Sequence, residues 1–327
     1  MSNEWRDIAK KISNWGKWGP NDQIGTLNYI TPAKIASAAA TAKQGKIFPL
    51  SIPVDAYGPQ GASGFRRNPI HIMSVDGGDE SAARFLEGWG GATEAQMVAM
   101  TSGPMRFTDD FIIMPLQGST QWDALSHVYY DGQLYNGYPA ASVTSFGATK
   151  DSIDQVAGRG QIVSRAVLLD VARHRKVQYL APKTVISPEE LDDVCRAQKV
   201  TVESGDIVLI RTGWRLNFLE TRDGEAWLHN SPGLSWRCAE WLSNKQVAAI
   251  ASDNIAVEVT ASEFADAFLV FHMLTLRDMG MMLGEIWDLE ALGADCANDG
   301  VYAFMLVAQP LRVTGGVGSP VNPIAIK

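Results

Sequence analysis

The chain has 327 residues, 46% of them hydrophobic, and a formal net charge of −8 at pH 7. A chain of this length and composition can bury a full hydrophobic core, which excludes intrinsic disorder over most of it. The acidic balance, without a run of Lys or Arg, argues against nucleic acid and membrane surfaces as partners and leaves a small-molecule substrate as the expected partner.

The three cysteines are far apart in the sequence and form no Cys-x-x-Cys pair. Neither a disulfide framework nor a thiolate zinc site is therefore predicted. The first residues are charged, and no segment approaches the roughly 20 apolar residues that a membrane span needs. We expect a cytoplasmic protein.

The N-terminal residues, about 1–32, predict an ordered arm, because they are rich in turn formers and aromatic side chains. Thr31 followed by Pro32 predicts a helix over 33–42, in which Thr31 is the cap and Pro32 occupies the first position. Further helices are predicted over 188–198, after the cap Ser187, and over 235–244.

Several short apolar runs, bounded by Gly, Pro or Asp, have the character of strands. They cover residues 47–52, 111–115, 166–170, 206–212, 247–252 and 301–307. Strands and helices that alternate in this way favour an α/β fold. We find no internal repeat and no linker, so a single domain over 1–327 is predicted, while residues 54–110 give no clear prediction.

The segment from Gln117 to His127 concentrates polar side chains that can bind a metal. Gln121 and Asp123 share parity, so in a strand they project from one face, about 6.6–7 Å apart. In a straight strand His127 would lie roughly 13 Å from Asp123. His127 can therefore share an ion with Asp123 only if the chain bends through residues 124–126.

Two further metal-competent residues, His272 and Glu285, lie downstream. One unbroken helix would separate them by about 19–20 Å. Gly280 and Gly284 make that helix improbable. A short helix that ends near Gly280 and is followed by a strand would return both side chains to one cavity.

Each of these positions also has a structural interpretation without a metal. Asp123 and His127 could form a loop hydrogen bond, and His272 could be a hydrogen-bonded core histidine. As a set, carboxylate, imidazole and amide oxygen are borderline-to-hard ligands that suit zinc or manganese.

The segment 117–127 resembles the signature of the cyclase-like metal-dependent hydrolase family, which includes kynurenine formamidase, isatin hydrolase and trans-dienelactone hydrolase. That signature reads His-x-Gly-Thr-His-x-Asp-x-Pro-x-His. Its Thr, its Asp and its last His fall on Thr120, Asp123 and His127.

Other segments extend this resemblance to roughly residues 110–310. Residues 204–214 resemble a strand of the family, and His272 with Glu285 resembles its downstream metal pair. Residues 18–28 resemble the N-terminal arm of the longer members, the branch associated with lactone hydrolysis. The resemblance implies a single α/β domain with a compact mixed-strand core flanked by helices, which assembles as a homodimer or homotetramer.

The chain departs from the signature at Gln117 and Gln121, where the family has metal-binding histidines. Members with the full signature can hold two ions, so the loss of both imidazoles implies one divalent ion here, Zn²⁺ or Mn²⁺. Two ligand sets remain open. One set is Asp123, His127, His272 and Glu285, and the other is Gln121, Asp123 and His272, with His127 and Glu285 left for proton transfer.

The resemblance implies a hydrolase that opens a cyclic ester (lactone) or a cyclic amide by attack of metal-bound water, or alternatively cleaves a linear formamide. His127 is the first choice for the general base and Glu285 the second. Two other classes of protein remain open. One is a metal-dependent dehydratase or isomerase, and the other is a non-catalytic binding protein with the same fold.

Two tryptophans are candidates for contact with the substrate. Trp18 lies in the Gly-rich arm, where an exposed aromatic ring could form one wall of the site. Trp122 stands between two candidate ligands, but in a strand it faces the opposite way, and such a residue is more often part of the core than a substrate contact.

Overall fold

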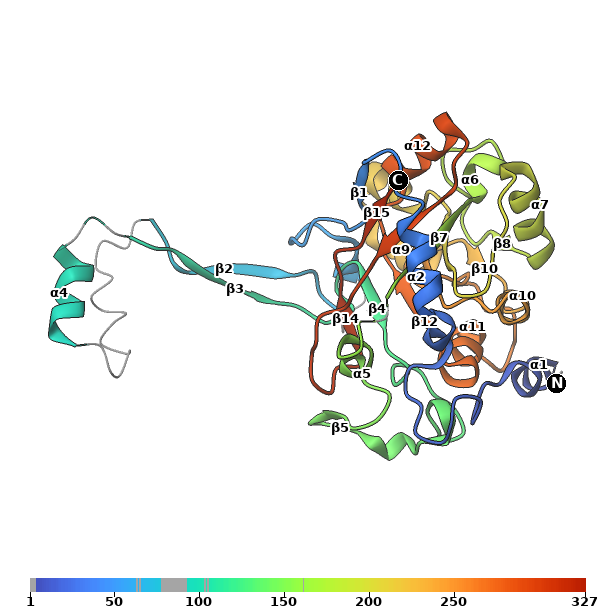
Figure 1. The fold of residues 1–327 in the computed structure, drawn as a ribbon, viewed down its shortest axis with the longest axis horizontal. Coiled ribbons are helices and arrows are strands. Elements are labelled where there is room, and N and C mark those ends of the chain that lie inside the picture. Colours follow the sequence, from blue (N-terminus) through green and yellow to red (C-terminus); the bar gives the residue numbers. More distant parts are fainter. Residues whose placement is uncertain are drawn as a thin grey trace.

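The computed structural model describes residues 4–62, 64, 66–77, 93–102, 104, 106–160 and 162–327. A nine-stranded mixed sheet with helices packed around it forms the body of the molecule (Figure 1). In spatial order its strands are β1 (Ile47–Pro49), β15 (Ile324–Ile326), β13 (Ala303–Val307), β7 (Val163–Asp170), β9 (Ile207–Arg211), β11 (Ala249–Ser252), β12 (Met282–Glu285), β4 (Gln121–Asp123) and β14 (Gly318–Pro320). The predicted α/β class with a mixed-strand core is confirmed.

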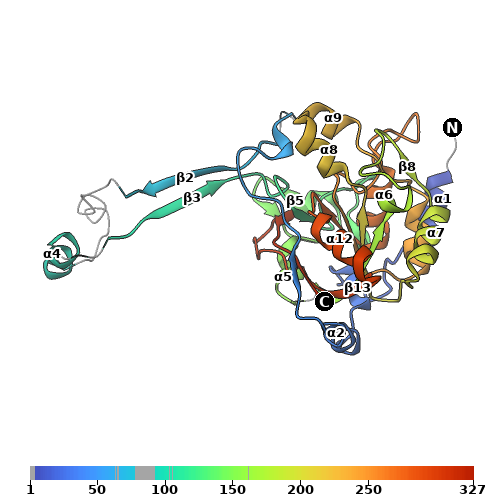
Figure 2. The same ribbon diagram turned by 90° about the horizontal axis from the view of Figure 1, so that it is seen from above.

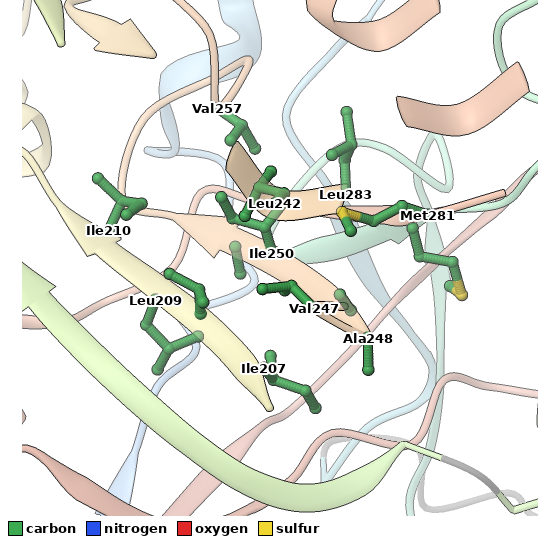
Figure 3. Close-up of a cluster of buried hydrophobic side chains, with 14 of the residues drawn as sticks. Ile207, Leu209, Ile210, Leu242, Val247, Ala248, Ile250, Val257, Met281 and Leu283 are labelled. Atoms are coloured by element: carbon green, nitrogen blue, oxygen red, sulfur yellow. The ribbon is translucent and has the colours of Figure 1, made fainter. Parts of the chain in front are cut away.

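The four central strands, β7, β9, β11 and β12, run parallel to one another. The sequences of β7, β9 and β11 consist largely of Val, Ile, Leu and Ala, as expected for strands that are covered on both faces. Figure 3 shows side chains such as Ile207, Ile250 and Leu283 gathered between these strands and their neighbours. This buried block fixes the position of β12.

Strand β4 pairs antiparallel with β12 on one side and with β14 on the other. This region of the sheet is therefore antiparallel, although the neighbouring centre is parallel. The candidate residues Gln121 and Asp123 lie on β4, and Glu285 ends β12. The sheet itself thus brings segments together that are about 160 positions apart in the sequence.

The helices pack around the sheet. They are α1 (Glu4–Ile12), α2 (Pro32–Ala39), α5 (Ile153–Ala157), α6 (Val171–His174), α7 (Pro188–Gln198), α8 (Trp214–Thr221), α9 (Gly224–His229), α10 (Cys238–Asn244), α11 (Val270–His272) and α12 (Glu290–Asp299). The predicted caps are confirmed, because Thr31 accepts from the backbone N–H of Lys34 and Ser187 from that of Glu190, each at 3.2 Å. The predicted arm contains a helix of its own, α1.

The strand predicted over 111–115 is present as β3, but it lies outside the main sheet. Among the residues that the structure describes, strand β3 (Asp109–Ile113) pairs with β2 (Ile70–Val75) alone, in a ribbon that projects from the body and leads to α4 (Glu94–Ser102), as Figures 1 and 2 show. The apolar residues of β3 are solvent-exposed in the monomer. An apolar run alone does not reveal whether a strand is covered by its own chain.

Across the part of the chain that the structure describes, no helix is both long enough and apolar enough to cross a membrane.

Candidate metal centre

The centre is built on the pairing of β4 with β12. Gln121 lies directly opposite Glu285 in this antiparallel pair, so the two side chains share one face of the sheet with Asp123. The Gln121 amide Nε2 donates to Glu285 Oε2 at 2.6 Å and lies 3.5 Å from Asp123 Oδ1. On the opposite face of β12, Gly284 leaves room for its neighbours, because a Cβ there would lie 2.6 Å from the Ala251 methyl group.

His272 reaches the same face from the end of α11. The chain continues as a π-helix over Met273–Met279, turns at Gly280 with φ +66° and enters β12. The expected turn near Gly280 is thus present. His272 Nε2 lies 3.2 Å from Glu285 Oε1 and 3.9 Å from Asp123 Oδ2.

His127 lies at the rim of this cluster. Its backbone N–H donates to the carbonyl of Ala124 at 2.9 Å, so the chain makes the bend that the spacing required. His127 Nε2 is then 3.8 Å from Asp123 Oδ1. The same nitrogen is 3.3 Å from a guanidinium nitrogen of Arg66.

Three side chains, Asp123, His272 and Glu285, converge closely enough to bind one ion. Each offers a ligand atom, and these atoms lie within 4.8 Å of one another in a buried setting. Asp123 Oδ2 and Gln121 Oε1 are buried and have no hydrogen-bond partner among the described residues. Buried acceptors without donors are costly, so a divalent cation fits this donor set.

The arrangement matches neither predicted ligand set completely. Gln121 presents its amide nitrogen to the carboxylates rather than its oxygen, and His127 turns Nε2 toward Arg66. The structure brings together three of the four residues of the first predicted ligand set, which are Asp123, His272 and Glu285. The roles of Gln121 and His127 as ligands stay predictions.

Burial and charge perturb the ionisable groups of the centre. Burial raises the pKa of Asp123 to about 6, and burial lowers the pKa of His127. Burial also opposes a charge on His272, but hydrogen bonds to Glu258 and Glu285 prevail and raise its pKa to about 10. A proton on His272 thus balances the carboxylates, and a divalent ion would take over that function.

Glu258 was missed by the sequence reasoning. Its Oε1 lies 2.5 Å from His272 Nδ1 and also accepts from the His272 backbone N–H at 2.9 Å. This contact places the Nδ1 proton toward Glu258 and directs Nε2 to the cluster, as carboxylates beside metal-binding histidines do. The one available signal was a carboxylate within the apolar run 255–259.

Glu258→Gln is expected to weaken zinc binding about 10–100-fold, because the amide no longer fixes the imidazole as strongly. Competition with a chromogenic chelator measures the affinity. Glu263→Gln serves as the control, since Glu263 accepts from Ser235 and Trp236 outside the cluster. Equal zinc affinity in Glu258→Gln and wild type would remove this positioning role.

Trp122 lies in the hydrophobic core, which favours the core interpretation, and its contact with a substrate stays a prediction. Its ring is fully buried, packs edge-on against Trp287 at 5.1 Å and donates to the carbonyl of Ala308 at 2.7 Å. The alternation of β4 turns it away from Gln121 and Asp123. Trp18 packs edge-on against Tyr29 at 5.1 Å, and its contact with a substrate stays a prediction.

Asp151 lies behind the turn that carries His127, where its carbonyl accepts from the N–H of Ser126 at 3.1 Å. Its side chain is buried, and neither carboxylate oxygen has a hydrogen-bond partner among the described residues. Burial, and then repulsion by Asp22, raises the pKa of Asp151 to about 8.

Asp151→Asn is expected to stabilise the protein at about pH 8 by about 1 kcal/mol or more. An unfolded Asp loses its proton near pH 4 but the folded one only near pH 8, so the free energy of unfolding of the wild type falls as pH rises between these values. Asn is neutral throughout and tolerates the φ of +56°. Thermal unfolding should show a difference in Tm between variant and wild type that grows from about pH 5 to about pH 8. A difference in Tm that does not depend on pH would contradict this prediction.

The fold and this cluster together define an α/β protein with a candidate metal centre at the antiparallel part of its sheet. The sequence profile of a family described as putative cyclase matches residues 27–259. The chain therefore belongs to the putative cyclase family, as the segment 117–127 indicated.

Solved structures agree with this assignment. A protein described as a novel cyclase is 40% identical, with a TM-score of 0.84 over 98% of this chain and 99% of that one. Isatin hydrolase A from Labrenzia aggregata, bound to benzyl benzoate, is 16% identical, with a TM-score of 0.59 over 89% and 96%. Isatin hydrolase A from Ralstonia solanacearum is 19% identical, with a TM-score of 0.59 over 90% and 97%. These last two show a shared fold. No curated protein matches the chain.

Proposed function

We propose that this protein is a metal-dependent hydrolase that opens a cyclic amide or a cyclic ester. The observation that carries the proposal is the convergence of Asp123, His272 and Glu285, with ligand atoms within 4.8 Å of one another in a buried site. The shared fold with isatin hydrolases, whose name describes hydrolysis of isatin, supports the choice of a cyclic amide.

One divalent ion, Zn²⁺ or Mn²⁺, would be held by Asp123, His272 and Glu285. Such an ion lowers the pKa of water and polarises a carbonyl group. The Gln121 amide donates to Glu285 Oε2 and lies near Asp123 Oδ1, so it occupies the carboxylate oxygens other than the two nearest His272 Nε2, and this supports a single ion.

His127 is the proposed general base. Its side chain is 20% exposed, whereas those of Asp123, His272 and Glu285 are at most 4% exposed, so His127 can meet a water molecule beside the ligands. Because burial lowers its pKa, His127 is neutral and able to accept a proton at neutral pH. It would then return that proton to the leaving nitrogen or oxygen.

Ring opening in ¹⁸O-labelled water tests the reaction. The zinc- or manganese-loaded protein is incubated with a panel of cyclic amides, lactones and aryl formamides, and the products are analysed by mass spectrometry. Hydrolysis requires one labelled oxygen in each new carboxylate. Unlabelled product would favour a dehydratase or isomerase, and binding without turnover would favour a non-catalytic protein.

A homo-oligomer formed through the β2–β3 ribbon is also proposed. Ile70 pairs with Ile113 and Ile72 with Phe111, so the four side chains share one face, and each is 43–56% exposed. A two-stranded ribbon is marginally stable alone, and a second copy could cover this face by two-fold symmetry.

Phe111→Asp is expected to reduce the assembly to monomers, because it places a charge on that apolar face. Light scattering after size exclusion measures the mass, and Asp109→Asn on the same strand is the control. A wild type that is monomeric at micromolar concentration would contradict the proposal.

A further inference from the structure

The side chain of Arg66 enters the candidate metal centre from the connection that leads into β2. One guanidinium nitrogen, Nη2, lies 3.3 Å from His127 Nε2, and the other, Nη1, lies 4.0 Å from Glu285 Oε2. Arg66 therefore stands beside both the proposed base and a proposed ligand. The motif in residues 117–127 gave no indication of it.

Exposure identifies the side from which a substrate approaches. The side chains of Asp123, His272 and Glu285 are 0%, 4% and 3% exposed, whereas those of Arg66 and His127 are 18% and 20% exposed. Solvent thus reaches the centre past Arg66 and His127. A carbonyl group that approaches the ligands from this side must pass beside the guanidinium.

The chemistry of the guanidinium suits the charge that develops in the reaction. It presents N–H donors in a rigid plane that matches carboxylate geometry. When the oxygen of water bonds to the carbonyl carbon, the π electrons move to the carbonyl oxygen. His127 takes one of the water protons in this step. When the ring C–N or C–O bond then breaks, the leaving atom takes that proton from His127, and the new carboxylic acid releases its own proton to solvent and becomes a carboxylate.

We infer that Arg66 is a catalytic residue that donates to the substrate's carbonyl oxygen as negative charge develops there and then holds the carboxylate of the product. This inference rests on the proposed hydrolase function. Under this inference the three ligands hold the ion, His127 transfers the proton, and Arg66 donates to the oxyanion. It also defines the substrate as one that yields a carboxylate within reach of Arg66.

The first test measures binding and needs no turnover. Benzoate, a simple carboxylate, is titrated by calorimetry into the zinc-loaded wild type, Arg66→Ala and the control Arg67→Ala, which removes the exposed neighbouring cation. We expect the Kd for benzoate to rise at least about tenfold in Arg66→Ala, the loss that one charge-assisted hydrogen bond predicts, and to stay unchanged in Arg67→Ala. An equal Kd in all three, or no benzoate binding by the wild type, would overturn the inference.

The second test uses a substrate that the labelled-water panel identifies. Loss of one oxyanion donor is expected to lower kcat about 10²–10³-fold in Arg66→Ala, with KM and zinc content nearly unchanged. Guanidinium chloride should restore part of the activity to Arg66→Ala and none to His127→Ala. Loss of zinc from Arg66→Ala, or kcat within about threefold of wild type, would count against the role.

The two tests separate this inference from the proposed function. A wild type that turns over no substrate but binds benzoate through Arg66 would contradict the hydrolase proposal and leave the carboxylate site in place. A wild type that hydrolyses a lactone or cyclic amide while Arg66→Ala is equally active would contradict the Arg66 inference alone.

Discussion

Asp123→Ala and His272→Ala are each expected to reduce the bound metal from about one ion per chain to nearly none and to lower kcat/KM about 10³-fold or more. Each removes one of three converging ligands, and the remaining pair cannot enclose an ion. Loss of the ion removes several kcal/mol of charge stabilisation in the transition state, and each 1.36 kcal/mol corresponds to a factor of ten.

Metal content is measured by mass spectrometry of the desalted protein after incubation with zinc or manganese. His229→Ala is the matched control, because His229 is exposed and pairs with Glu225 on the surface. Circular dichroism establishes that each variant is folded. A wild type that binds neither ion after incubation would overturn the metal centre and favour the binding-protein alternative.

His127→Ala is expected to lower kcat about 10²–10⁴-fold while the ion stays bound. The reason is geometric: His127 Nε2 lies 3.3 Å from Arg66 and 3.8 Å from Asp123 Oδ1, beside the three converging ligands and not among them. Removal of its imidazole therefore takes away the proton acceptor and leaves the ligands intact.

Metal content and steady-state kinetics are measured together on His127→Ala. His71→Ala is the control, because His71 is an exposed histidine on the ribbon that pairs with Asp110. Loss of the ion from His127→Ala would make His127 a ligand, as in the first predicted set. An unchanged kcat with the ion bound would exclude both roles.

Local chemistry made much of the fold predictable. The caps Thr31 and Ser187 and the apolar strands of the centre follow from short-range propensities, and the helix over 188–198 has the bounds that its cap and spacing indicate. The turn at Gly280 was predictable for the same reason, since an unbroken helix from His272 to Glu285 through two glycines is unfavourable.

The centre was predictable only in part. Asp123, His272 and Glu285 belong to short segments with metal-competent spacing, whereas Arg66 and Glu258 contribute one side chain each from segments without a motif. Their function depends on which strands pair, and pairing is a long-range property that local periodicity does not determine. Trp122 shows the converse, because its neighbours on both sides are candidate ligands and yet strand alternation buries it.

The same pairing suggests how such a site could diversify in evolution. Gly284, next to Glu285 on β12, has Ala251, Trp122 and Trp287 within 2.9 Å of the position that a Cβ would occupy, so almost any substitution there would displace Glu285. Arg66, by contrast, lies on a connection outside the main sheet. Changes in that connection would alter which substrate is accepted without disturbing the ligands. We therefore expect relatives that act on different substrates to differ in this connection and to retain the β4–β12 pair.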